Sequence, residues 1–288
     1  MITPLIYSNN ILVAARELLQ NPNNDEGDME TRKDGDICFI TGNWPLTAGR
    51  PTIIFIHGAA LSKGLWDAQV ESLSDIADTL AIDLPGHKDS NGPACDRISD
   101  YALAVGLFVE RMQISTPILC GLSMGGAVTL ELLITRPDLF RSAILMHTGA
   151  RLKVFPFIFE SIQTDYSKYL DMVVEFSVSK KSDRSQVKTI MNEITVLSPD
   201  VALKDFTACD QFDVMEKLSR IMAEVLVVTG DEDAITPPKY GQFLQNNIPN
   251  AKLTSIAETG HLSPIEKPEQ VNRLIRDFLS TQTSLDIA

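Results

Sequence analysis

The residue best placed for covalent chemistry in this sequence is Ser123, because of what surrounds it. It lies in the pentapeptide Gly-Leu-Ser-Met-Gly (121–125), directly after the apolar run 117–120 and directly before a helix-like run. A nucleophile at a tight strand-to-helix turn needs small neighbours, and the turn places its hydroxyl at the positive end of the helix. The amide of Met124 is then placed to donate to an oxyanion. The pattern predicts a nucleophilic serine.

A serine nucleophile needs a general base, and the sequence holds four histidines. His57, His147 and His261 each follow an apolar run, whereas His87 lies in a polar turn. The carboxyl ends of parallel strands open at one edge of a sheet, so the first three histidines could each approach Ser123. We expect His87 to be a turn residue. Spacing alone leaves the base open among the other three.

The acid that orients such a base has three candidates. Asp231, Glu232 and Asp233 all follow the apolar run 224–229. All three could therefore reach the same edge of a parallel sheet. Spacing does not choose among them.

These residues need elements to position them, and from residue 37 apolar runs alternate with helix-like segments. The apolar runs cover 37–40, 52–58, 79–83, 117–121, 142–149, 224–230 and 251–257, and the helix-like segments cover 65–77, 97–113, 124–136, 238–247 and 267–280. Several runs are apolar without alternation, as strands covered on both faces are. The pattern predicts an α/β fold with a mostly parallel central sheet flanked by helices.

One interval breaks this rhythm. Residues 150–223 hold amphipathic stretches but no convincing buried strand, which predicts a helical cap inserted into a core made of 37–149 and 224–288. Residues 1–36 read as an N-terminal helix and linker. An apolar stripe over 8–20 could pack on its own domain or form a homodimer contact.

The order and spacing of these motifs are similar to those of the α/β-hydrolase family over about residues 37–288. The family's nucleophile elbow matches 121–125 and its His-Gly loop matches 57–58. Its Asp-x-x-Gly-His turn matches 83–87, although Lys88 stands where the family usually has glycine. The chain thus resembles small capped serine esterases and lactonases of this family.

The resemblance implies the roles that spacing leaves open. The family's base lies in a Gly-His pair after the last strand, which matches His261. Its acid lies in a Gly-x-x-Asp-x-x-x-Pro pattern, which matches 230–237 and selects Asp233. The chain order of nucleophile, acid and base is also the family's. The resemblance therefore implies a triad of Ser123, Asp233 and His261.

The same resemblance implies an oxyanion hole and a substrate pocket. In the family the histidine matched by His57 is structural, and the amide of the next residue but one, here Ala59, joins that of Met124 in holding the oxyanion. The expected substrate-binding residues are Leu61, Trp66, His147, Phe155 and Phe157. For His147 a structural role is an equal alternative, and the two phenylalanines could instead form the core of the insertion.

Composition excludes several classes of protein. The formal net charge of -13 would repel a phosphate backbone, so no nucleic-acid partner is expected. No run approaches the ~20 apolar residues that span a bilayer. Four scattered cysteines without a CxxC pair indicate free thiols, and a cytoplasmic location is expected. No metal or organic cofactor is expected.

Taken together, these features predict an enzyme that cleaves a small carboxylic ester, thioester or lactone through an acyl-enzyme on Ser123. Carbon–carbon bond hydrolysis, a lyase reaction or a cofactor-free peroxidase reaction on the same fold is the alternative. A ligand receptor built on a hydrolase scaffold is a third interpretation. Because the nucleophile is serine, the aspartate-based dehalogenase and epoxide-hydrolase branches are excluded.

Overall fold

A computed structural model describes residues 29–115 and 117–282. They form one eight-stranded sheet with the strand order β1-β2-β4-β3-β5-β6-β7-β8. The strands from β4 to β8 pair in parallel, while β2 runs antiparallel to both β1 and β4. The predicted mostly parallel sheet is confirmed.

Helices follow the strands as the alternating pattern predicts. The strands are β1 (Glu30–Asp34), β2 (Ile37–Thr41), β3 (Thr52–Ile56), β4 (Asp78–Ile82), β5 (Pro117–Leu122), β6 (Ser142–Met146), β7 (Glu224–Gly230) and β8 (Ala251–Ile256). The core helices are α2 (Asp67–Leu73), α3 (Ile98–Arg111), α4 (Met124–Thr135), α9 (Lys239–Asn247), α10 (Ser263–Glu266) and α11 (Pro268–Gln282), with a 3₁₀ turn at Lys63–Trp66.

The central strands are buried on both faces, which explains their unbroken apolar sequences. In β3, Ile54 and Ile56 pack into one hydrophobic cluster, whereas Ile53 and Phe55 pack into another. Helices α3 and α4 contribute to the first cluster, and α2 and α11 contribute to the second. The sheet is therefore the middle of three layers, and its strand ends are left free to carry a site.

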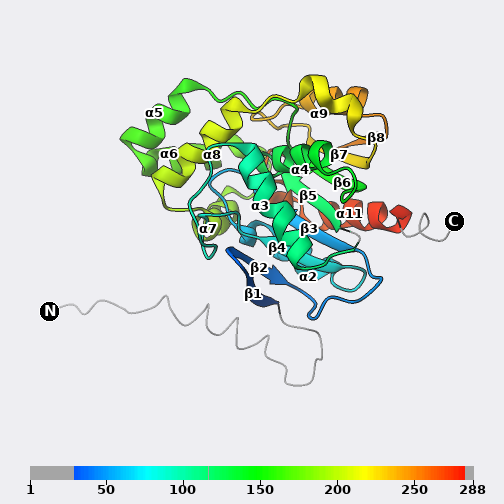
Figure 1. Cartoon of the computed structure of the whole chain (residues 1–288). Coiled ribbons are helices and arrows are strands. Elements are labelled where there is room, and N and C mark those ends of the chain that lie inside the picture. Colours follow the sequence, from blue (N-terminus) through cyan, green and yellow to red (C-terminus); the bar gives the residue numbers. More distant parts are fainter. Residues whose placement is uncertain (1–28, 116, 283–288) are drawn as a thin grey trace.

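Four helices occupy the interval for which a helical cap was predicted. They are α5 (Pro156–Thr164), α6 (Tyr166–Ser177), α7 (Arg184–Ile194) and α8 (Pro199–Gln211), followed by a 3₁₀ turn at Met215–Arg220. Figure 1 shows these helices grouped together at one side of the molecule, while α9 and α11 lie at the other. Strand β7 then resumes the sheet.

The N-terminal part departs from the sequence interpretation. Strand β1 lies inside the segment 1–36, for which a helix and linker were predicted, and it forms a hairpin with β2. Its sequence, Glu-Thr-Arg-Lys-Asp, is polar because it sits at the edge of the sheet, where its side chains are largely exposed. The predicted helix over 8–20, and with it the dimer interpretation, lies outside the described residues.

Helix α4 approaches the sheet so closely that only glycine fits at the contact. A Cβ atom at Gly125 would lie 2.2 Å from the carbonyl oxygen of Ile56 in β3. At Gly106, in the interior of α3, the nearest atom to such a Cβ would be a methyl group of Leu132 at 3.5 Å, an ordinary contact. The two helical glycines therefore have opposite steric constraints.

We expect Gly125→Ala to lower the free energy of unfolding by about 3 kcal/mol or more, because backbone rather than side chain would have to move. Gly106→Ala is the matched control, since the same methyl group enters a helix where space exists. It should raise the free energy of unfolding by about 0.5–1 kcal/mol. Urea unfolding of both variants measures the difference, and equal destabilisation would contradict the steric argument.

Candidate active site

Four residues with the chemistry of a hydrolytic site lie at the ends of four neighbouring strands. Ser123 follows β5, His147 follows β6, Asp233 lies three residues after β7, and His261 follows the turn after β8. These strands are consecutive and parallel in the sheet. Residues separated by as many as 138 positions therefore meet at one edge.

Ser123 occupies a constrained turn between β5 and α4. Its φ angle is +56°, in the left-handed region that non-glycine residues seldom adopt. Its amide donates to the carbonyl of Met146 at 2.9 Å, and its own carbonyl accepts from Thr148 Oγ1 at 2.8 Å. A Cβ atom at Gly121 would lie 2.2 Å from a backbone oxygen of Gly125. The glycines thus permit a turn that holds a half-buried serine between strand and helix.

His261 is held by a carboxylate on one side of its ring. Its Nδ1 lies 2.9 Å from Asp233 Oδ2. An ionised carboxylate only accepts hydrogen bonds, so Nδ1 carries the proton and Nε2 keeps a free lone pair. The backbone amide of His261 also donates to the carbonyl of Ser177 in the cap, at 2.6 Å. This ring is fixed in the tautomer that a general base requires.

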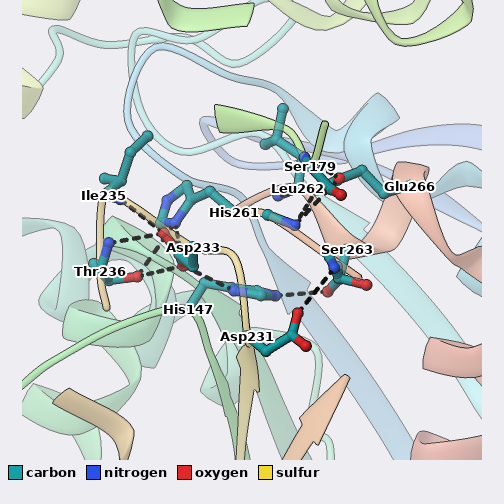
Figure 2. Close-up of polar contacts among 12 residues, drawn as sticks. His147, Ser179, Asp231, Asp233, Ile235, Thr236, His261, Leu262, Ser263 and Glu266 are labelled. Carbon is teal, nitrogen blue, oxygen red and sulfur yellow. Dashed lines mark hydrogen bonds and ion pairs between the residues drawn. The ribbon is translucent and has the colours of Figure 1, made fainter. Parts of the chain in front are cut away.

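The carboxylate of Asp233 accepts five hydrogen bonds. Oδ1 accepts from the amides of Ile235 and Thr236, both at 2.9 Å. Oδ2 accepts from Thr236 Oγ1 at 2.8 Å and from the Nδ1 atoms of His261 and His147 at 2.9 and 3.0 Å. Figure 2 shows the two imidazole rings converging on this group. Burial raises the pKa of Asp233, but both histidines outweigh burial and hold the pKa well below its usual range.

His147 lies behind the carboxylate and is fully buried. Its φ angle is +48°, and Nδ1 donates to Asp233 while Nε2 lies 2.7 Å from Ser263 Oγ. With its proton on Nδ1, Nε2 accepts from the serine hydroxyl, so the ring is neutral. Burial lowers the pKa of His147 and keeps it in that form. Of the two interpretations of this residue, the contacts favour the structural one.

The other two acids after β7 serve different partners. Asp231 Oδ1 accepts from the amide of Thr259 at 3.3 Å, and Glu232 Oε2 accepts from Ser179 Oγ at 2.8 Å. Both side chains belong to exposed residues. Asp233 is the one of the three that bonds to His261.

The His-Gly loop after β3 packs against the elbow. His57 is fully buried, its Nδ1 donates to the carbonyl of Gly58 at 2.9 Å, and its Nε2 accepts from the amide of Leu84 at 3.1 Å. A Cβ atom at Gly58 would lie 3.4 Å from the Cβ of Ser123. Ala59, the expected oxyanion donor, therefore follows a residue whose side chain, if it had one, would contact the elbow. Met124 is the first residue of α4, where an amide has no partner within the helix.

The five expected substrate-binding residues are placed in different environments. Leu61 lines a cavity of about 50 Å³ beside Ala59 that is closed mainly by apolar side chains of α6 and α7. Trp66 is fully buried and stacks on Phe55 with ring centroids 4.9 Å apart. Phe155 and Phe157 stack on each other and are 72% and 46% exposed. These two rings form neither the core of the cap nor the wall of this cavity.

One positioning residue escaped the sequence analysis. Glu266, in α10, accepts from the backbone amides of Ser179 at 2.8 Å, Gly260 at 3.1 Å and Leu262 at 3.1 Å. It therefore ties the loop that carries His261 to a segment of the cap (Figure 2). Its place five residues after His261 was the available signal, but its partners on the cap lie 84 and 87 positions away.

A possible metal site and a buried thiol lie near these residues. Donor atoms of His147, Asp233 and His261 lie within 4.8 Å of one another, the arrangement of a three-ligand metal site. Both Nδ1 atoms, however, already donate to the same carboxylate oxygen. Cys120 is fully buried beside Met146, and burial raises the pKa of its thiol well above the usual value.

Within the described residues no helix is long and apolar enough to cross a bilayer.

The fold and this strand-end constellation define the class of protein. The model of the alpha/beta hydrolase family matches residues 53–274. The chain belongs to that family.

Its relatives include named enzymes. Over 240 residues it is 25% identical to a pimeloyl-[acyl-carrier protein] methyl ester esterase of Nitrosomonas europaea, with 78% of this chain and 94% of that protein covered. It is 26% identical over 236 residues to 3-oxoadipate enol-lactonase 2 of Acinetobacter baylyi, with 79% and 88% covered. The crystal structure of an enol-lactonase from Burkholderia xenovorans LB400 superposes with a TM-score of 0.79 at 21% identity, covering 87% of this chain and 100% of that one.

The buried His57 generates a prediction for acid stability. Burial and the nearby His87 lower the pKa of His57 to about 3. Between about pH 6.5 and 3, His57 is protonated in the unfolded chain but neutral in the native state. Stability therefore falls with falling pH, by about 1.4 kcal/mol per pH unit from this residue alone.

In His57→Gln an amide oxygen can still accept from Leu84, but the group does not titrate. We expect its free energy of unfolding to fall less steeply than that of the wild type between pH 6 and 4, by roughly 1 kcal/mol per unit. Denaturant unfolding across this range measures the two slopes. Parallel slopes would show that His57 is protonated in the native state.

Proposed function

We propose that this protein is a serine hydrolase that cleaves a small carboxylic ester, or a related thioester or lactone, through an acyl-enzyme on Ser123. The observation that carries the proposal is that Ser123, Asp233 and His261 lie at one edge of the sheet, after the parallel strands β5, β7 and β8. The names of the esterase and lactonase relatives support the same bond type.

In the first step the Ser123 hydroxyl attacks the substrate carbonyl. His261 takes the hydroxyl proton on Nε2, the nitrogen left free because Nδ1 donates to Asp233. The ring becomes an imidazolium, and Asp233 stabilises this charge while holding the ring in place. The protonated Nε2 then donates to the leaving alkoxide, which departs as an alcohol and leaves an ester on Ser123.

The tetrahedral intermediate carries a negative oxygen that needs donors. The amides of Ala59 and Met124 are the proposed donors, one from the His-Gly loop and one from the start of α4. The positive end of the helix favours the same charge. Losing one such donor typically costs a factor of ~10² to 10³ in rate. Water, deprotonated by His261, then attacks the acyl-enzyme and releases the acid.

The cavity beside Ala59 is the proposed place of the acyl group, and its size favours a short one. At about 50 Å³ it is far smaller than the several hundred Å³ of pockets that hold drug-sized ligands. Its wall includes Leu61 and Met191.

A cytoplasmic location is part of the proposal and is supported by the four cysteines, all of them free.

We expect the wild type to hydrolyse p-nitrophenyl acetate and butyrate faster than the octanoate and dodecanoate, because the cavity is small. Ser123→Ala should lower kcat/KM by at least about 10³-fold, since it removes the attacking oxygen. Ser99→Ala, an exposed serine in α3, is the matched control and should leave turnover unchanged. Release of p-nitrophenolate measures all three proteins.

A covalent probe separates the chemistry from the choice of substrate. A fluorophosphonate should add to Ser123 in the wild type and in Ser99→Ala but not in Ser123→Ala, as read by intact mass. Cleavage of esters by Ser123→Ala at the wild-type rate would refute the proposed nucleophile. Labelling without turnover of any ester would retain the nucleophile and refute ester hydrolysis.

A further inference from the structure

Asp205 is a buried carboxylate that reaches from the cap into the core. It lies on α8 and has no exposed surface. Its Oδ2 accepts from the amide of Ala60 and from His87 Nε2, both at 2.8 Å, and its Oδ1 accepts from Tyr101 Oη at 2.6 Å. All three donors belong to the core domain, and one of them is the residue after Ala59.

His87 supplies the charge that balances this carboxylate. Its Nδ1 lies 3.1 Å from the carbonyl of Pro85 and its Nε2 faces Asp205. Both neighbours are acceptors, so both ring nitrogens carry protons. Burial lowers the pKa of His87, but the charge and hydrogen bond of Asp205 outweigh burial and raise it. The expectation that His87 is merely a turn residue is incomplete, because the structure makes it half of a buried ion pair.

An ion pair at this depth is not explained by stability alone. Removing two charges from water is costly, and apolar side chains of similar volume are often equally or more stabilising. What the pair provides is a fixed acceptor for the Ala60 amide. That amide needs one because Ala60 is buried. The φ angle of Ala60, +57°, is also a strained conformation that persists only where surrounding contacts hold it.

The cap also forms hydrogen bonds with other parts of the loop 59–62. The carbonyl of Ala60 accepts from the amide of Val196 at 2.9 Å, and Ser62 Oγ donates to the carbonyl of Ile194 at 2.7 Å. Both partners lie between α7 and α8 or at the end of α7. Ala59 therefore stands between Gly58, where any side chain would meet the elbow, and Ala60, whose amide and carbonyl both bond to the cap.

We infer that Asp205 is a positioning residue that holds the loop 59–62 from the cap, so that the amide of Ala59 faces the developing oxyanion. This inference rests on the proposed function and deepens it. Asp205 touches no reacting atom and acts through Ala60. It makes the geometry of the oxyanion hole dependent on the place of the cap.

The test is Asp205→Asn, whose single side-chain oxygen cannot serve three donors. With the loop released, kcat on p-nitrophenyl acetate should fall by about 10- to 100-fold, because the oxyanion contact is made mainly in the transition state. KM should stay within about 3-fold of the wild type, since ground-state binding uses this contact little. Asp200→Asn, an exposed aspartate in the first turn of α8, is the matched control and should leave kcat unchanged.

A loss of stability is separated from a loss of positioning by Tyr101→Phe. This variant removes the hydrogen bond from Tyr101 Oη to Asp205 and should lower Tm. It leaves the bond from the Ala60 amide to Asp205 in place, so kcat should stay within about 3-fold of the wild type. The inference is overturned if Tyr101→Phe loses kcat as severely as Asp205→Asn, or if folded Asp205→Asn keeps the wild-type kcat. If Asp205→Asn does not fold, Ser62→Ala loosens the same loop and should lower kcat by about 3-fold or more. An unchanged kcat would then overturn the inference.

A second measurement tests the role of Asp205 without ester turnover. Reaction of Ser123 with a fluorophosphonate also places an oxygen where the oxyanion forms. Its rate should fall by about 10-fold or more in Asp205→Asn and not in Asp200→Asn. Absence of ester cleavage by the wild type would refute the proposed function, whereas equal labelling rates would refute the role of Asp205.

Discussion

A buried, ionised carboxylate needs hydrogen-bond donors for its lone pairs. The edge of this sheet is organised around one such group, the carboxylate of Asp233. Asp233 is 3% exposed and accepts five hydrogen bonds. Leaving an ionised carboxylate unpaired at this depth would shift its pKa until it took up a proton. The turn after β7 supplies two amides and a hydroxyl, and the ends of β6 and β8 each supply a histidine. The charge that orients His261 thus also fixes three strand ends relative to one another.

Two other acids apply the same principle to the loops around the site. Glu266 collects amides from the His261 loop and from the cap, and Asp205 collects an amide from the loop that contains Ala59. In each case a carboxylate serves as a shared acceptor for backbone donors that no regular element could pair. Part of the acid excess of this chain is therefore internal and positions backbone rather than covering the surface.

What the sequence predicts and what it misses follow from the range of the interactions. The alternating strands and helices depend on neighbouring residues, and local pattern was enough to predict them. The turn that carries Ser123 and the helices α5 to α8 lie where the local pattern predicts an elbow and a cap. The strand β1 was missed because an exposed edge strand carries no apolar signal. His87 and Asp205 are 118 positions apart, and a histidine in a polar turn gives no sign of a distant buried partner. The placement of Phe155 and Phe157 at the surface was equally beyond local pattern, because exposure depends on what the rest of the cap covers.

The four helices between β6 and β7 are not equally attached to the core. Helix α8 buries four residues and α7 buries three, and Asp205 and the chain between α7 and α8 bond to the loop 59–62. Helix α5 buries only Ile162, and α6 buries only Tyr169 and Ser177. Elements with few buried contacts open at lower free energy than elements packed into a core. The cavity beside Ala59 therefore opens at the lowest free energy by movement of α5 and α6, because that movement leaves the hydrogen bond between α8 and the loop 59–62 intact.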